Sequence, residues 1–181
     1  VWMVLQAFSW HEIGSGTEPY WPTFEESRFM AYACIAQGAG GILYWGSDFL
    51  KNDEFRASLY ALTSELAAIE PFLRAKAQGI EVRLLEAADQ PTRLGIGLIA
   101  RQVDNEWIIA VVNRDDYPHL GVEVLGLNAL GQRPLHLLYG EETVQPDPEG
   151  SIITRLQPYQ TKVFSTTMNY QSTAQEGRDF H

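Results

Sequence analysis

Cysteine is almost absent from this sequence, since Cys34 is the single one among 181 residues. An internal disulfide and a metal site built from several cysteines are therefore excluded. Basic residues are also scarce: 13 Lys and Arg stand against 23 Asp and Glu, and the formal net charge is -10. This balance is wrong for a phosphate-binding surface, so we expect no nucleic acid and no polybasic contact with a membrane. No apolar run reaches the roughly 18 residues that a spanning helix needs.

The remaining composition is that of a folded globular protein. Hydrophobic residues make up 45% and charged residues 20%, which allows a sizeable core. The length suits one ordinary domain or two small ones. The chain opens on Val1, inside the apolar run 1–5, without an initiator Met or a signal-peptide pattern. We therefore expect the C-terminal part of a longer protein; a chain that has lost its leader is the alternative. The compartment stays open, and a secreted or periplasmic protein is one option.

Residues 1–76 alternate between short apolar strands and helices. The expected elements, in chain order, are a strand at 1–8, a helix at 24–37, a strand at 41–45 and a helix at 54–76. Both strands are apolar on both faces, which is typical of a parallel sheet covered by helices. Two such strands cannot bury themselves, so we expect them to need neighbouring strands that this sequence does not contain.

Local signals predict where the two helices begin and end. Thr23 and Glu26 form a capping box before the first helix, and Gly38 supplies a left-handed stop after it. We expect Asp53 to cap the second helix and Pro71 to interrupt it before its last turn. The apolar residues of the second helix recur every three or four positions and form one stripe: Phe55, Leu59, Leu62, Leu66, Ile69 and Leu73.

After Gly79 the hydrophobic period changes from that of a helix to the alternation of a strand. Short strands with polar turns between them are expected at 80–84, 94–100, 107–112, 121–127, 134–139, 151–155 and 160–166. This spacing predicts an antiparallel β-sandwich. The polar tail, 167–181, is expected to be loosely ordered. The predicted fold class is thus α/β plus all-β, with a boundary at 78–79.

Three segments carry a resemblance to a known family. Residues 22–32 (PTFEESRFMAY), 38–45 (GAGGILYW) and 156–164 (LQPYQTKVF) resemble the C-terminal part of a (β/α)8-barrel glycoside hydrolase with its accessory β-sandwich. The resemblance implies that 1–78 form the seventh and eighth βα units of a partial TIM barrel and that 79–166 form the accessory domain. It implies a carbohydrate substrate and, as a partner, the missing N-terminal portion of the barrel.

Barrel enzymes carry their chemistry at the carboxyl ends of the strands and in the loops that follow. Six residues at these places are expected to bind substrate: Gln6, Phe8, Trp10, Tyr44, Trp45 and Asp48. Aromatic rings suit the apolar face of a sugar, and amides and carboxylates suit its hydroxyls. Trp45 matches the position at which the resembling enzymes commonly stack a sugar; the alternative is that it plugs the barrel mouth.

Glycosidases of this type need two carboxylates. The resemblance implies a nucleophilic Glu at the end of the seventh strand, but Gln6 stands there, and a neutral amide cannot replace a carboxylate. Glu12 is the nearest carboxylate and our candidate catalytic residue; a solvated loop acid is the alternative. The partner acid would come from a fourth strand that this chain lacks. We therefore expect the isolated chain to be inactive, whatever the full-length parent does.

Two other functions remain open beside that of an enzyme portion. In the first, the sandwich is a carbohydrate-binding module. In the second, it only braces the barrel. Its aromatics are few, and Trp107 and Phe164 lie in apolar strands where we expect core positions, which favours bracing. We expect no cofactor and no metal, since His11 beside Glu12 lacks the second His at helical spacing that a zinc motif needs.

Overall fold

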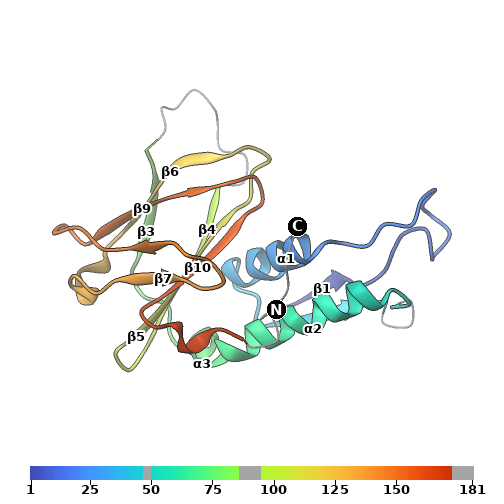
Figure 1. The fold of residues 1–181 in the computed structure, drawn as a ribbon, viewed down its shortest axis with the longest axis horizontal. Coiled ribbons are helices and arrows are strands. Elements are labelled where there is room, and N and C mark those ends of the chain that lie inside the picture. Colours follow the sequence, from blue (N-terminus) through green and yellow to red (C-terminus); the bar gives the residue numbers. More distant parts are fainter. Residues whose placement is uncertain (47–49, 86–94, 173–181) are drawn as a thin grey trace. The chain divides into compact units, whose positions relative to one another are not determined.

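The computed structural model describes residues 1–46, 50–85 and 95–172 (Figure 1). The chain divides into two compact units, Val1–Leu66 with Ser172–His181 and Ala67–Gln171. Among the described residues, no helix combines the length and the apolar character needed to cross a membrane.

The first unit has the predicted order of strand, helix, strand and helix. Its elements are β1 (Trp2–Gln6), α1 (Phe24–Ala36), β2 (Gly41–Trp45) and α2 (Asp53–Ala68). β1 and β2 pair in parallel, from Trp2 opposite Gly41 to Gln6 opposite Trp45. α1 is the crossover between them, as a parallel pair requires. The α/β character predicted for this part of the chain is confirmed.

The ends of the helices follow the local signals, with one exception. The hydroxyl of Thr23 accepts the amide of Glu26 at 3.1 Å, and the Glu26 carboxylate accepts the amide of Thr23 at 2.8 Å, which confirms the capping box. Gly38 has φ 89° and ends α1 as predicted. The predicted cap at Asp53 is wrong: the side chain of Asn52 accepts the amide of Phe55 at 2.8 Å, so Asp53 is already inside the helix.

Pro71 interrupts the second helix, as predicted. α2 ends at Ala68, and a separate turn, α3 (Glu70–Arg74), carries the proline near its start, where no backbone N–H is needed. The break changes which residues face inward, because Phe72 is fully buried and Leu73 only half-buried. Leu66 and Leu73 of the predicted apolar stripe are only half-buried, and Phe72, which was not part of it, is fully buried.

A buried carboxylate joins the two long helices of the first unit. Glu65 on α2 is fully buried and accepts the guanidinium Nε of Arg28 at 2.9 Å and the hydroxyl of Tyr32 at 2.7 Å, both from α1. Two charge-assisted contacts on one carboxylate satisfy a group that would otherwise be costly to bury.

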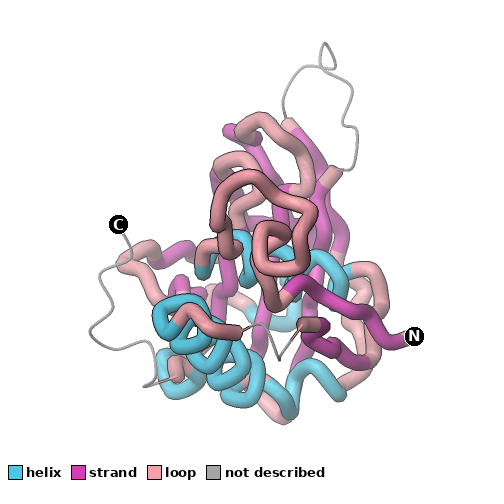
Figure 2. Tube along the Cα trace, turned by 90° about the vertical axis from the view of Figure 1, so that its right-hand side faces the viewer, coloured by secondary structure: helices cyan, strands magenta, loops and turns pink. Residues whose placement is uncertain are grey.

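The second unit contains two antiparallel sheets, and strands are coloured magenta in Figure 2. One has three strands in the order β3 (Glu81–Leu84), β6 (His119–Leu125) and β9 (Ser151–Leu156). The other has five in the order β4 (Ile96–Val103), β5 (Glu106–Asn113), β10 (Thr161–Ser165), β7 (Leu135–Leu137) and β8 (Thr143–Val144). Strands of both sheets contribute to one apolar core, which includes Trp107 and Phe164. The predicted β-sandwich is confirmed.

Three features of this unit differ from the prediction. Short 3-10 turns at Leu127–Leu130 and Met168–Tyr170 have no counterpart in it. Tyr170 packs edge-on against Phe72, with ring centroids 4.7 Å apart, so the expectation of a loose tail is wrong at this point; residues 173–181 lie outside the described residues. The compact division lies between Leu66 and Ala67 and not at 78–79, because α3 packs against β4.

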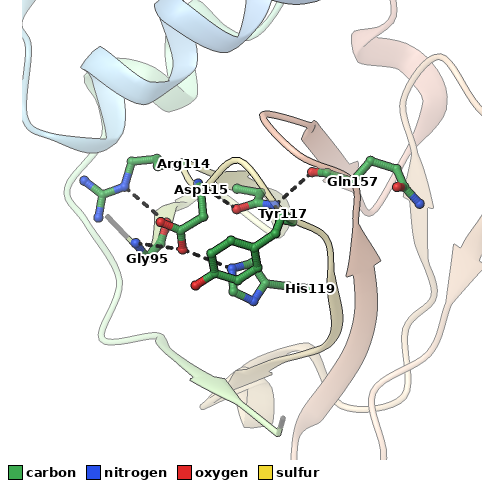
Figure 3. Close-up of polar contacts among 7 residues, drawn as sticks. Gly95, Arg114, Asp115, Tyr117, His119 and Gln157 are labelled. Carbon is green, nitrogen blue, oxygen red and sulfur yellow. Dashed lines mark hydrogen bonds and ion pairs between the residues drawn. The ribbon is translucent and has the colours of Figure 1, made fainter. Parts of the chain in front are cut away.

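A buried polar network holds the loop after β5. The amide of Asn113 donates to the carbonyls of Tyr117 at 2.7 Å and Gln157 at 2.9 Å. The carboxylate of Asp115 lies 3.1 Å from Nε2 of His119, and both side chains are buried (Figure 3). These contacts tie the β5–β6 connection to the turn between β9 and β10.

Candidate functional site

The ends of β1 and β2 place two of the predicted residues side by side. Gln6 is paired with Trp45 at the last position of the ladder, and paired residues share a face of the sheet. Val4 and Leu43, two positions earlier on the same face, are 59% and 51% exposed, and Trp45 is 54% exposed. Gln6 and Trp45 therefore lie at the end of the uncovered face of the parallel pair.

An aromatic cluster of Phe8, Trp10 and Trp45 lies at this end of the sheet. Phe8 is buried, and its ring centroid is 5.0 Å from that of Trp10 and 4.9 Å from that of Trp45. Both indoles stand nearly perpendicular to the phenyl ring, at 75° and 84°. Phe8 is thus a spacer between two indoles, and it presents little surface of its own to a ligand.

Gly46 allows this arrangement. Its φ of 95° is unfavourable for any other residue, and a Cβ added there would lie 2.8 Å from the ring of Phe8. Sequence reasoning missed Gly46, although a glycine directly after a strand is a recognisable sign of close backbone approach.

The side-chain amide of Gln6 forms a hydrogen bond with the backbone two residues further along the chain. Its Nε2 donates to the carbonyl of Phe8 at 2.8 Å. No other hydrogen bond to this side chain occurs within 1–46, 50–85 and 95–172, so its carbonyl oxygen is available as an acceptor for a hydroxyl.

Backbone hydrogen bonds shape the loop after β1. The amides of Ser15 and Gly16 donate to the carbonyl of Trp10 at 2.9 and 3.1 Å, and the amide of Glu12 donates to the carbonyl of Ser9 at 3.0 Å. Ser9 is fully buried, and its hydroxyl accepts the amide of Tyr20 at 2.9 Å. Sequence reasoning missed Ser9, because serine in a loop carries no distinctive pattern. Trp10 therefore belongs to a loop that backbone hydrogen bonds close.

Glu12 is half-buried on this loop. Its Oε2 is inaccessible to solvent and has no hydrogen-bond partner among the residues that the structure describes. A buried carboxylate oxygen is costly to leave unpaired. Nδ1 of His11 lies 3.3 Å from the carbonyl of Gly16, so this ring nitrogen contacts the loop backbone.

Tyr44 lies on the other face of the sheet. It packs against the buried Ala7, Phe55 and Leu59, and its hydroxyl is buried. This burial, with a smaller contribution from Cys34, raises the pKa of Tyr44 to about 12. Because side chains alternate along a strand, Tyr44 and Trp45 point to opposite faces. The structure therefore does not bring Tyr44 together with Gln6 and Trp45, and Asp48 lies outside the described residues.

The side chains gathered at the ends of β1 and β2 are aromatic and polar. Among the described residues, no group of three or more His, Cys, Asp or Glu side chains is arranged to hold a metal ion. The structure brings together the amide of Gln6 and the indoles of Trp45 and Trp10 around Phe8 at the ends of β1 and β2.

Comparisons with known proteins reveal similar folds. No protein-family model matches the sequence, and no curated protein matches it. The alpha-amylase from Geobacillus thermoleovorans, crystallised with acarbose, is 16% identical, with a TM-score of 0.51 over 78% of this chain and 33% of that chain. AmyP in complex with maltose is 13% identical, with a TM-score of 0.51 over 79% of this chain and 34% of that chain. The chain thus spans about a third of the length of the solved structures it matches.

These likenesses define the class of fold. The chain has an α/β part followed by an antiparallel β-sandwich, and the predicted fold class is confirmed. The resemblance to part of a (β/α)8-barrel glycoside hydrolase with its accessory sandwich is confirmed at the level of fold.

Proposed function

We propose that this chain is the C-terminal portion of a carbohydrate-active glycoside hydrolase. Its first unit contributes sugar-binding residues at the mouth of the barrel, and its sandwich braces that barrel. The observation that carries the proposal is the pairing of Gln6 with Trp45 at the end of the uncovered face of β1 and β2. Chemistry in barrel enzymes lies at the carboxyl ends of the strands, where this pair stands.

The fold likeness supports the same proposal. The two similar structures were crystallised with acarbose and with maltose. The missing portion of the barrel would supply the neighbours that the exposed Val4 and Leu43 lack. The buried positions of Trp107 and Phe164 support bracing as the role of the sandwich, because neither ring is available to a glycan.

Trp45→Ala in the full-length protein tests the proposal. Loss of stacking worth about 1 kcal/mol should weaken saccharide binding about fivefold, measured by titration calorimetry, and part of the loss should appear in kcat. Gln6→Ala should weaken binding by roughly 1–3 kcal/mol, because the entering hydroxyl loses its acceptor. Tyr60→Ala is the matched control, since Tyr60 is an aromatic residue on α2 that is 66% exposed. Unchanged kcat/KM for Trp45→Ala on every glycoside tested would overturn the site assignment.

Glu12→Gln decides the role of the loop carboxylate. The substitution keeps the shape of the side chain and removes its charge. A catalytic carboxylate would lose several hundredfold in kcat, corresponding to about 3–4 kcal/mol of transition-state stabilisation. We expect a smaller loss, mainly in KM, because Glu12 lies on the substrate loop and its buried Oε2 is suited to accept a hydroxyl.

A non-catalytic carbohydrate-binding protein is the second candidate. The observation that favours it is the amide of Gln6, which stands where the resembling enzymes carry their nucleophile. Saccharide binding by the full-length protein without hydrolysis of any glycoside would decide for this candidate.

A further inference from the structure

We propose that Ser9 and Tyr20 are positioning residues, which fix the loop carrying Trp10 and Glu12 to the start of α1 before any ligand binds. Neither of the two is among the residues expected to bind substrate. The inference rests on the proposed function, because it concerns how tightly a saccharide is held at the ends of β1 and β2. It starts from three hydrogen bonds that link the end of β1, the loop after it and α1.

Ser9 ties the two ends of the loop together. Its hydroxyl accepts the amide of Tyr20 at 2.9 Å, and its carbonyl accepts the amide of Glu12 at 3.0 Å. Ser9 is fully buried, so water does not compete for the bond to Tyr20. A segment whose ends meet in this way, with a tight turn inside it, is a compact Ω-loop. The shape of the loop therefore depends on Ser9 and not only on the turn at its tip.

Tyr20 ties the loop to the helix that follows. Its hydroxyl lies 2.7 Å from each carboxylate oxygen of Glu26, and this carboxylate also accepts the amide of Thr23 in the capping box. A phenol that donates to a carboxylate makes a charge-assisted hydrogen bond. The same bond, with smaller contributions from burial and from the charge of Glu26, raises the pKa of the Tyr20 hydroxyl. One carboxylate thus holds both the first turn of α1 and the end of the loop.

These ties act on the two candidate residues of the loop through the backbone. Trp10 follows Ser9 directly, and the amide of Glu12 is bonded to the Ser9 carbonyl. The ring centroid of Trp10 is 5.0 Å from that of Phe8, and Oε2 of Glu12 is inaccessible to solvent. Loss of a tie should make the closed loop one of several conformations. The apparent affinity for a ligand then falls with the fraction of molecules in the closed form.

Tyr20→Phe and Ser9→Ala in the full-length protein test the proposal. The first removes only the hydroxyl that reaches Glu26, and the second only the acceptor of the Tyr20 amide. Hydrogen exchange of residues 9–20 without ligand should quicken in both variants. Exchange of α1 and the melting temperature should stay unchanged, because a loop opens locally with less free energy than the whole unit.

Saccharide binding by the same variants is the second measurement. The probes are glucose-, galactose- and xylose-based oligosaccharides, with affinity measured by calorimetry. We expect affinity to fall about fivefold in Tyr20→Phe and about tenfold in Ser9→Ala, since an exposed tie contributes less than a buried one. On any glycoside that the protein hydrolyses, KM should rise by the same factor while kcat is unchanged, because the closed form that does bind is the same.

Conservative and matched variants separate positioning from a general loss of stability. Glu26→Gln keeps an acceptor oxygen and a side chain that suits a capping box, so it should bind more tightly than Glu26→Ala. Tyr60→Phe is the control for Tyr20→Phe, because Tyr60 is 66% exposed on α2. Ser27→Ala is the control for Ser9→Ala, because the Ser27 hydroxyl is buried without a hydrogen-bond partner among the described residues. Both controls should exchange and bind as the wild type does.

The outcomes keep this inference apart from the function on which it rests. Unchanged exchange of the loop in both variants, or faster exchange with unchanged affinity, overturns the positioning role and leaves the proposed function intact. A melting temperature that falls together with affinity in Tyr20→Phe would show a structural role alone and would also overturn the inference. A wild-type protein that binds no saccharide overturns the proposed function, and the positioning role with it.

Discussion

The two compact units differ in how far each covers its own apolar residues. In the first unit, β1 and β2 bury Leu5 and Ala7 on one face, while Val4 and Leu43 on the other face are mostly exposed. In the second unit, residues 108–112 of β5 are fully buried. A two-stranded parallel sheet needs neighbours and a second covering layer, whereas an antiparallel sandwich closes its core with its own second sheet. The sandwich thus covers its own apolar core, whereas the parallel pair leaves one face uncovered.

Separating the units should produce the largest effect. We expect residues 67–171 alone to be monomeric and to unfold in one cooperative transition, because their core is closed. Residues 1–66 alone should aggregate, since the open edges and uncovered face of β1 and β2 are free to pair with other copies. Size-exclusion chromatography and calorimetry measure both. A cooperatively melting monomer of residues 1–66 would break the comparison, and so would aggregation of residues 67–171.

Glu65→Ala should destabilise the first unit strongly. The substitution leaves the charge of Arg28 and the hydroxyl of Tyr32 without their common partner in a buried position. We expect a loss of about 3–5 kcal/mol in the free energy of unfolding of this unit, measured by denaturant titration. Glu70→Ala is the matched control, because the Glu70–Arg74 pair is exposed and contributes little. Equal effects of the two substitutions would show that the buried pair does not hold the helices.

Asn113→Ala should weaken the second unit by a smaller amount. The carbonyls of Tyr117 and Gln157 would lose their shared donor, which should cost roughly 1–3 kcal/mol. Hydrogen exchange should show faster opening of the β5–β6 connection, with the centre of β5 still protected. A uniform acceleration across the whole sandwich would mean that Asn113 supports the core and not only the loop.

Alkaline pH should weaken the first unit through Tyr44. Burial raises the pKa of its hydroxyl from the ordinary 10.0 to about 12. The folded state therefore keeps a proton that the unfolded state loses, so this contribution is complete below pH 10.0 and is lost as the pH rises through about 12. We expect the free energy of unfolding of the first unit to fall by on the order of 2 kcal/mol in the wild type. Tyr44→Phe should remove this part of the pH dependence, and a variant with the same alkaline profile as wild type would contradict the assignment.

Much of the fold was predictable from local patterns. Residues only a few positions apart form the capping box of Thr23 and Glu26 and cause the break at Pro71. The structure contains both features. The alternation after Gly79 predicted the sandwich for the same reason. The cap at Asn52 was misplaced by one residue because Asn and Asp stand side by side and both favour that position.

The candidate site was predictable only in part. Its location at the strand ends followed from the order of elements, and Gln6 and Trp45 were both expected there. The spacer role of Phe8 was not, because it depends on contacts with Trp10 and Trp45 from two different segments. The placement of Tyr44 against Phe55 and Leu59 likewise depends on which face α2 covers.

The sequence alone was enough to predict the succession of strands and helices, the acidic net charge, and the split into an α/β part and a β-sandwich. Hydrophobic periodicity and helix caps involve residues a few positions apart, so they can be recognised in the sequence without a structure. Only the tertiary structure decided that Gln6 and Trp45 share a face, that Tyr44 lies opposite, and that two indoles flank one buried phenyl ring. The β1–β2 register and the Phe8–Trp45 contact join residues that are far apart in the chain, and a shift of one position along either strand would move Gln6 or Trp45 to the opposite face.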